Sequence, residues 1–418
     1  MKKCRKSFAL GLFLAISIIT GAFADCPGDE LKVMIKGNKK TKESTIRRLA
    51  DIRGECVPEE GIDAVSIKQK LLNSHLFSKV EVHIEKEPGI VTVYITVKDK
   101  WSIIPIPVLY TSEEQSGGGL LILESNLLGR KKLIVAGGGA GNVGYAIEGL
   151  YLDDAVMGSK WILVLRQLYV DRELYQYDED DEEIYAYAEK FSLLFGILGY
   201  RVTDWLAPGI GFIYRYRDFD AVDEYTAPQD ERCTNGAMLN LRIDKTDFTD
   251  YYDKGLMGTI VLQHSLKMLG ARTIYGHLEA TFDFTYPIWK VLTRTFIEGG
   301  WSISEDARLS NYYRLGGSVG RRGLPTDGLW VRDYISVSEQ LEQVVYRHKW
   351  GTVTIAEFAD CVFTDVDDNG VTYTAFPAVG AGLRAYIKEL AIPAVGVDAG
   401  YGIRAGEWHI SAYAGKAF

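Results

Sequence analysis

The chain has 418 residues, a net charge of −9 at pH 7, 25 tyrosines and 43 glycines. This acidic balance argues against a nucleic-acid binder, which would normally carry a basic face. After the N-terminus no stretch reaches the roughly 18–20 consecutive apolar residues of a transmembrane helix, so a membrane-embedded chain would have to form a closed β-barrel.

The N-terminus has the pattern of an export signal. A basic start is followed by an apolar run from Phe8 to Ile19 and by the small-x-small site Ala22-Phe23-Ala24. We therefore expect residues 1–24 to be removed and the mature chain to lie outside the cytoplasm. Cys26 and Cys56 fall in one small segment of that chain, and export favours a disulfide between them.

Residues 25–99 predict one small α+β domain. The expected elements, in order, are a strand at Leu31–Ile35, helices at Thr41–Ala50 and Asp63–Asn73, and strands at Lys79–Ile84 and Val91–Val97. Hydrophobic periodicity, capping residues and turn signals between the elements indicate this β-α-α-β-β order. About 70 residues can bury one independent core, but this order by itself says little about function.

Residues 100–418 predict an all-β domain of about sixteen antiparallel strands. Apolar and polar residues alternate in successive segments, most clearly from Ile274 to Tyr286. A soluble sandwich would give the same alternation, but so many segments in an exported chain rich in tyrosine and glycine favour a transmembrane barrel with lipid outside and water inside. Long polar loops are expected at Asp171–Glu183, Asp218–Asn235, Glu305–Trp330 and Phe363–Gly370, with short connections between them.

One of these loops contains a glycine–arginine segment, Leu315 to Leu324. Four glycines surround Arg321 and Arg322, and glycine permits positive φ and a close approach to neighbouring backbone. We expect the loop to fold into the barrel, where a carboxylate holds one guanidinium, because an arginine in a partly dehydrated interior needs such a partner. The alternative is a solvated surface loop.

These motifs together resemble the BamA-type outer-membrane assembly and translocation barrels. Gly320-Arg321-Arg322-Gly323-Leu324 is similar to the Val-Arg-Gly-Phe/Tyr loop of that family, although Arg321 and Leu324 depart from its pattern. Residues 124–130 are similar to the turn after the family's second barrel strand, and residues 379–384 to its third-last strand. The terminal Phe418 matches its closing signal, and residues 25–99 resemble a single POTRA (polypeptide-transport-associated) domain.

The resemblance implies a specific pair of residues inside the barrel. The family's loop arginine corresponds to Arg322, and its acidic partner, in a Phe-x-Asp motif, corresponds to Asp360 of Phe358-Ala359-Asp360. Glu357 is an alternative partner. If the guanidinium is well buried, breaking the pair would cost about 3–5 kcal/mol, because the remaining charge has no partner.

The resemblance also implies a seam between the first and last barrel strands. These strands are expected at about Trp101 to Tyr110 and about Trp408 to Phe418. Proline removes ladder donors and glycine weakens a strand, so the seam should be weak at four positions: Pro105, Pro107, Gly406 and Gly415.

The function that the resemblance implies is insertion or translocation of client proteins at the bacterial outer membrane. Unfolded outer-membrane or secreted clients would pair with the sheet edge of the periplasmic domain by β-augmentation and then be templated at the seam. Outer-membrane lipids and periplasmic accessory proteins would be further partners. No bond-making chemistry, metal or cofactor is expected. The alternatives are a passive pore or an exporter of one partner, and thirdly an esterase using His264 or His277.

Three further motifs have simpler interpretations. Gly139-x-Gly141-x-x-Gly144 fits a dinucleotide fingerprint, but strand period continues after it, so a tight hairpin is expected. Asp365-x-Asp367-x-Asn369-Gly370 begins like a calcium loop, yet Phe376 stands where a bidentate Glu is needed. The six acids from Asp178 to Glu183 are expected to be solvated.

Overall fold

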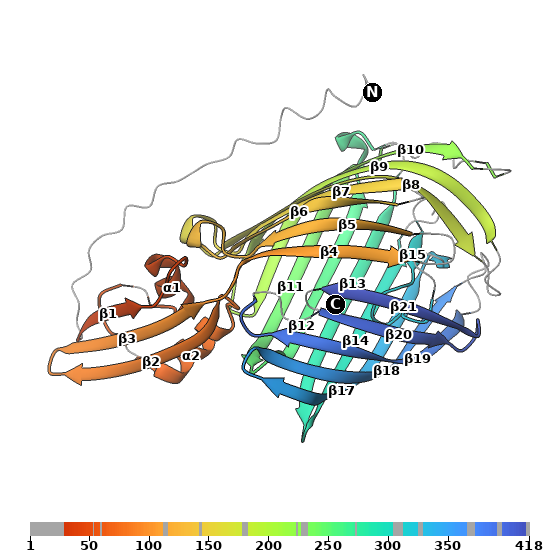
Figure 1. Cartoon of the computed structure of the whole chain (residues 1–418). Coiled ribbons are helices and arrows are strands. Elements are labelled where there is room, and N and C mark those ends of the chain that lie inside the picture. Colours follow the sequence, from red (N-terminus) through yellow and green to blue (C-terminus); the bar gives the residue numbers. More distant parts are fainter. Residues whose placement is uncertain are drawn as a thin grey trace.

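The computed structural model has a small α+β domain followed by a large curved β-sheet (Figure 1). It describes residues 29–414 except 53, 59–60, 112–115, 142–143, 178–182, 223–224, 227–232, 272–273, 304–311, 325–328, 366–372 and 391–394. The expected signal segment, Cys26, Gly415, Phe418 and most of the acidic run at 178–183 therefore lie outside the described residues.

The small domain has the predicted β-α-α-β-β order. Its elements are β1 (Glu30–Lys36), α1 (Glu43–Leu49), α2 (Ala64–Leu72), β2 (Phe77–Glu87) and β3 (Ile90–Asp99). The sheet order is β1-β3-β2, with β1 parallel and β2 antiparallel to β3. Both helices pack their apolar faces on this sheet, around fully buried Ile46, Leu71 and Ile95. Among the described residues, no helix is long and apolar enough to cross a membrane.

The two edges of this sheet differ. Beside β1, the Leu31 amide donates to the Glu55 carbonyl at 2.7 Å, and the Val57 amide donates to the Asp29 carbonyl at 3.1 Å. Between these bonds lies Cys56, which is disulfide-bonded, and the partner expected for it, Cys26, lies outside the described residues. The start of the β1 edge is therefore covered, whereas β2 forms the opposite edge of the sheet.

In the described residues, the second domain is a sheet of sixteen strands, as predicted. Its strands are β4 (Ile103–Thr111), β5 (Ser116–Glu124), β6 (Lys132–Gly141), β7 (Gly144–Asp153), β8 (Trp161–Tyr177), β9 (Glu183–Tyr200), β10 (Leu206–Ala221), β11 (Gly236–Thr249), β12 (Tyr252–Ser265), β13 (Gly276–Ile288), β14 (Val291–Ser302), β17 (Tyr334–His348), β18 (Gly351–Asp365), β19 (Tyr373–Ile387), β20 (Val395–Gly402) and β21 (Glu407–Ala414). Short 3-10 helices lie at Leu127–Gly129, Val156–Gly158 and Lys267–Leu269. Neighbouring strands pair antiparallel throughout.

Two stretches expected to be a loop and a hairpin are largely built of strand residues. The loop predicted at Asp171–Glu183 is mostly strand, because β8 and β9 keep pairing out to Tyr177 and Glu183. The Gly139–Gly144 motif lies in the β6–β7 hairpin, where Gly141 is paired with Gly144.

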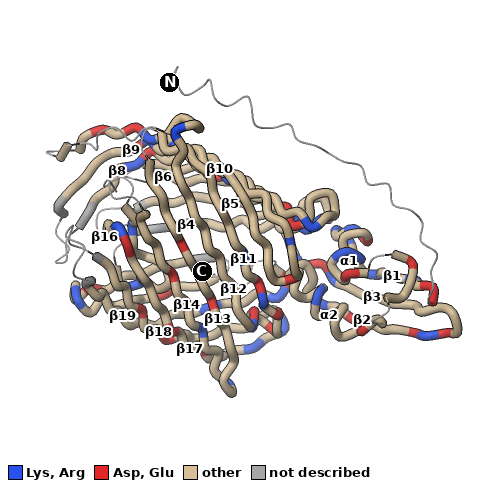
Figure 2. Tube along the Cα trace, turned by 180° about the vertical axis from the view of Figure 1, so that it is seen from behind, with Lys and Arg blue, Asp and Glu red and all other residues tan. Residues whose placement is uncertain are grey.

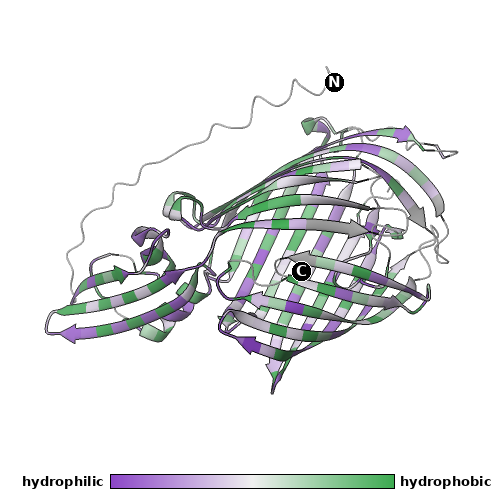
Figure 3. Ribbon diagram, viewed as in Figure 1, coloured by the Kyte–Doolittle hydropathy of each residue, from purple (hydrophilic) through white to green (hydrophobic). Residues whose placement is uncertain are grey.

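The sheet curls into a barrel (Figure 1), and its strands alternate between apolar and polar residues (Figure 3). The exposed fractions show that the apolar residues face outward and the polar ones inward. On β17 the inward Ser338, Gln340 and Glu342 are about 1% exposed, whereas the outward Ile335 and Leu341 are 40% and 44% exposed. Figure 2 shows that charged residues gather in the small domain, at the turns beside it and at the far end of the barrel. An apolar outer face around a polar interior is the reverse of the arrangement in a soluble protein, whose apolar residues face inward.

Candidate functional site

The connection between β14 and β17 folds back into the barrel. Within it, β15 (Tyr313–Leu315) pairs with β16 (Leu329–Val331) as a small separate hairpin. The described part of the segment between these strands, 316–324, contains the glycine–arginine motif. We call the described residues 312–324 and 329–331 the inserted loop. Its tip reaches the inner wall formed by β17, β18, β19 and β20.

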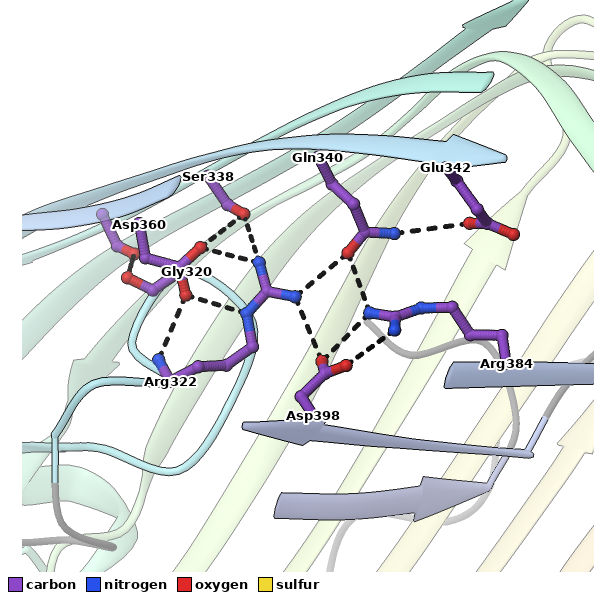
Figure 4. A network of polar contacts seen from close by, with 9 residues as sticks. Gly320, Arg322, Ser338, Gln340, Glu342, Asp360, Arg384 and Asp398 are labelled. Carbon is purple, nitrogen blue, oxygen red and sulfur yellow. Dashed lines mark hydrogen bonds and ion pairs between the residues drawn. The ribbon is translucent and has the colours of Figure 1, made fainter. Parts of the chain in front are cut away.

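Arg322 at this tip is bound to Asp360 on β18 (Figure 4). Its Nη2 and Nε lie 2.7 Å and 2.9 Å from the two carboxylate oxygens, and its backbone amide donates to the same carboxylate at 3.1 Å. Both side chains are 1% exposed. The guanidinium also lies over the ring of Phe358, 3.3 Å from the centroid. Arginine's planar fork suits this bidentate and stacked arrangement, which lysine would not reproduce.

A second ion pair completes the charge balance around Arg322. Asp398 on β20 accepts from Arg322 Nη1 at 3.1 Å and from Arg384 Nη2 at 3.0 Å. Arg384 Nη1 lies 2.6 Å from the other carboxylate oxygen, at an angle unfavourable for a hydrogen bond. Gln340 accepts from both arginines, and Ser338 bridges Arg322 and Asp360. Two buried cations therefore face two buried anions, and the buried Glu342 carboxylate beside them accepts hydrogen bonds from Gln340, Thr354 and Tyr386.

Glycines on both sides allow this close contact. Gly320 has φ +82°, and a Cβ there would lie 2.2 Å from the Ser336 hydroxyl, which donates to the Gly320 carbonyl at 2.9 Å. A Cβ on Gly323 would lie 2.3 Å from the Ala378 Cβ. On the wall, a Cβ on Gly400 would lie 2.5 Å from the Arg322 carbonyl oxygen. Each position therefore requires glycine for the loop tip to seat against the wall.

The neighbours of Arg322 face different surroundings. Arg321 is partly exposed; its Nη2 lies 3.1 Å from Glu298, which also accepts from the Tyr334 hydroxyl at 2.6 Å. Leu324 stands where the resembled family usually has an aromatic residue. It is buried in an apolar cluster with Leu315, Leu329, Val331, Tyr334, Val362 and Phe376. This cluster fixes the base of the tip, while the ion pairs fix its end.

The structure brings together Arg322 and Asp360, but it does not place Glu357 with them. Glu357 is exposed on the outer face of β18, because successive residues of a strand point to opposite sides. The prediction of Glu357 as the alternative partner of Arg322 is therefore wrong. Asp398, Arg384, Ser338 and Gln340 were missing from the expected site. Their only signal in the sequence is that each polar residue interrupts an apolar strand at an inward position.

The inserted loop has another contact, on a different part of the wall. Arg314 on β15 binds Glu189 on β9, with Nη1 3.1 Å and Nη2 3.4 Å from the carboxylate, and it donates to the Tyr187 hydroxyl at 2.8 Å. Trp330 on β16 packs against the Tyr187 ring, with centroids 5.4 Å apart. These residues were not expected in the site, since nothing nearby in the chain indicates that β9 faces the loop.

The first and last strands are the edges of the sheet. Their Cα atoms come within 8 Å in places, but in the described residues no ladder pairs β4 with β21. Pro105 and Pro107 both pair regularly with β5. Because they are two residues apart in a strand, both ring nitrogens point to the same side of β4. Proline is tolerated where its nitrogen faces an unpaired edge, so this side is the one toward β21, where two donors are then absent. Trp408 is 65% exposed beside Tyr401 on β20.

The small domain docks on one end of the barrel through several turns; we call this the domain-side end (Figure 1). The Gly129 carbonyl accepts from the Lys42 amide at 3.1 Å and from the Thr45 hydroxyl at 2.8 Å. Asn73, at the C-terminal cap of α2, donates to Asp247 near the end of β11 at 2.9 Å and accepts from the Phe248 amide at 2.8 Å. These bonds fix the orientation of the domain.

An electrostatic contact adds to this docking. Arg48 on α1 lies 3.5 Å from Asp154 in the β7–β8 turn, which is also close to Lys131 and Arg201. Burial opposes ionisation of Asp154, but the positive charges of Lys131, Arg48 and Arg201 outweigh it and hold the pKa of this carboxyl below its ordinary value. The site therefore remains charged at neutral pH.

Comparison with known proteins gives a likeness of fold. No protein-family model matches the sequence, and no curated protein is significantly similar to it. Among solved structures, BamA from Haemophilus ducreyi lacking POTRA domains 1–3 has a TM-score of 0.55 and 15% identity, over 92% of this chain and 83% of that one. CdiB from Escherichia coli has a TM-score of 0.63 and 14% identity, over 92% and 75%. CdiB from Acinetobacter baumannii has a TM-score of 0.61 and 11% identity, over 92% and 73%. The chain thus has the fold of a BamA-type barrel.

Proposed function

We propose that this chain is an outer-membrane factor of the BamA type that inserts or translocates β-rich client proteins, with its small domain in the periplasm. The observation that carries the proposal is the burial of Arg322 on Asp360, at the tip of a loop folded into a barrel. The family resemblance implies this pair, and the likeness of fold to BamA and CdiB supports the assignment.

The surface of the barrel supports a membrane location. Large apolar side chains, such as Ile210, Leu383 and Ile410, are 56–74% exposed on its outer face. In water such a surface would be a strong aggregation site, whereas in lipid it is the expected one. The export pattern at the N-terminus agrees with an outer membrane, and the domain-side end would then face the periplasm.

Client uptake would start at the small domain. β2 is a sheet edge whose main-chain groups can pair with an extended client segment without reading its sequence. The β1 edge is the weaker candidate, because residues 55–57 already cover its start. The client would then reach the seam between β4 and β21, where missing ladder donors at Pro105 and Pro107 favour opening.

The inserted loop argues against a passive pore. It is bound to the wall at Asp360 and at Glu189, on the thirteenth and the sixth of the sixteen strands. A segment fixed at both of these walls crosses the interior of the barrel. The activity proposed here involves no bond-making chemistry; the loop would hold the barrel in a working conformation.

The test compares client insertion by the wild-type chain and by Arg322→Ala in liposomes. An unfolded small barrel protein is added, and its folding into the bilayer is followed by protease protection. We expect the variant to lose most of the stimulation while its own barrel stays folded. Arg347→Ala is the matched control, since Arg347 makes a comparable pair with Asp250 at 3.1 Å but is 61% exposed.

Two results would contradict the proposal. Wild-type liposomes with steady conductance and no effect on client folding would indicate a pore. Equal stimulation by the wild type and Arg322→Ala would remove the loop from the mechanism. Labelling of the purified chain by a serine-directed probe would revive the esterase alternative.

A further inference from the structure

One residue, Glu389 in the β19–β20 turn, touches both the small domain and the start of the barrel. Its carboxylate lies 2.6 Å from Lys98 Nζ on β3 and accepts from the Ser78 hydroxyl on β2 at 3.2 Å. Its backbone carbonyl accepts from the Trp101 amide at 2.7 Å. In Figure 1 the dark blue connection after β19 reaches the junction between β3 and β4.

Ser78 marks the barrel-side end of the β2 edge. The pairing of β2 with β3 shifts between Phe77 and Lys79, so Ser78 is an extra, bulged residue. Bulges interrupt the regular row of donors and acceptors at an edge, so an added strand can pair from Lys79 onward but not past Ser78. A client strand held along β2 would therefore end beside Glu389.

Trp101 marks the domain-side end of the seam. It forms an isolated parallel bridge with Leu390, and its amide bond to Glu389 joins the beginning of the first barrel strand to the turn before β20. Along the rest of the described seam, β4 and β21 share no ladder. The β19–β20 turn thus closes the seam at the end that faces the small domain.

This inference rests on the proposed function. We propose that Glu389 lies where a client strand leaves the β2 edge and enters the barrel at the β4 edge, a step that we call the hand-off. The contacts of its carboxylate keep that passage closed until the client displaces them. Such a contact should be weak. The Lys98–Glu389 ion pair is weak because the two side chains are 61% and 43% exposed to solvent. Exposed ion pairs of this kind shift an equilibrium only about two- to five-fold, which a paired strand can overcome.

The test locks the junction. Cysteines are placed at Ser78 and Glu389 in a full-length chain whose Cys233 and Cys361 are serine, and a short reducible thiol crosslinker joins them. Client insertion into liposomes should fall more than tenfold when the tether is formed and return when it is cleaved. The background chain receives the same crosslinker and reductant, because Cys56 is also disulfide-bonded.

A second tether is the matched control. Cysteines at Asn73 and Asp247, which are hydrogen-bonded at 2.9 Å, fix the small domain to the barrel near the end of β11 without touching the seam. This tether should leave insertion unchanged. Equal losses with both tethers would overturn the proposal, since domain immobilisation alone would then explain the effect.

The untethered variants give an independent readout. Glu389→Ala should increase client crosslinking at the β4 edge about two- to five-fold, as expected for loss of one exposed pair, and Glu389→Gln, which keeps the hydrogen bond to Ser78, should give less. A decrease with Glu389→Ala would contradict the hand-off. If Glu389 variants and tethers are inert while Arg322→Ala still abolishes insertion, only this inference fails. If the wild type itself does not stimulate insertion, the proposed function fails.

Discussion

Arg314 and Glu189 form a buried ion pair that ties the inserted loop to β9, with the Glu189 side chain only 1% exposed. Eight residues further along the same loop, Arg322 is held on β18, seven strands away in the sheet of sixteen. The loop is therefore anchored at two walls that lie nearly opposite each other. Either anchor alone would keep part of the loop inside the barrel.

Two anchors predict that conductance depends on both arginines. Arg314→Ala or Arg322→Ala alone should give only brief openings in planar bilayers, because the remaining pair retains the loop. The double variant should conduct steadily, and its mean current should be well above that of either single variant. A double variant that conducts no more than Arg322→Ala would show that Arg314 does not retain the loop.

The Arg322 network should be sensitive to charge removal on one side. Asp360→Asn leaves Arg322 buried with only part of its compensating charge, and we expect the barrel to lose about 3–5 kcal/mol of stability. The temperature at which the folded band disappears in a gel-shift assay measures this. Glu357→Gln is the control, since Glu357 lies on the same strand but faces outward. It should change the melting temperature little.

Close packing of the loop tip predicts that a larger residue at Gly323 is harmful and that a smaller residue at Ala378 compensates for it. Gly323→Ala would bring its new Cβ to 2.3 Å from that of Ala378, so overpacking should cost about 1–3 kcal/mol and impair client insertion. Ala378→Gly removes that clash, and the double variant should recover part of the loss. The Gly402 backbone, 3.1 Å from the same position, would limit full recovery. No recovery would mean that the tip does not seat against Ala378.

Lys100, in the linker between the domains, predicts a pH dependence of domain docking. Burial lowers the pKa of this amine to about 8 from its ordinary value of 10.5, although Asp253 and Glu389 partly oppose the shift. The folded state therefore binds fewer protons than the unfolded state between about pH 8 and 10.5, and stability rises with pH in that window. Below pH 8 the amine is charged in both states and its burial cost is constant.

The measurement is the stability of the docked small domain at several pH values between 7 and 10.5. Spin labels on the small domain and the barrel report the loss of docking. The wild-type chain should become more stable relative to Lys100→Met as the pH rises. The difference between the two chains is the readout, because tyrosines and other lysines titrate in the same range. A constant difference across the window would refute the prediction.

The sequence by itself determined the architecture. Alternation of apolar and polar residues depends only on the period of a strand, so the number of barrel strands and the order of the small domain could be predicted from local pattern. The same alternation separates Asp360 from Glu357, and applying it strictly would have removed Glu357 from the site. The density of glycine around Arg322 likewise predicted a loop that packs closely against something.

Only the tertiary structure decided which residues meet. Asp398 and Arg384 join Arg322 because β19 and β20 lie beside β18, and Glu189 meets Arg314 because barrel curvature brings β9 across from the loop. The role of Glu389 likewise depends on a turn that reaches the small domain 311 and 291 residues away in the chain, at Ser78 and Lys98. Such contacts depend on strand order, register and the curvature of the barrel, which are set by the whole sheet at once and leave no local signal in the sequence.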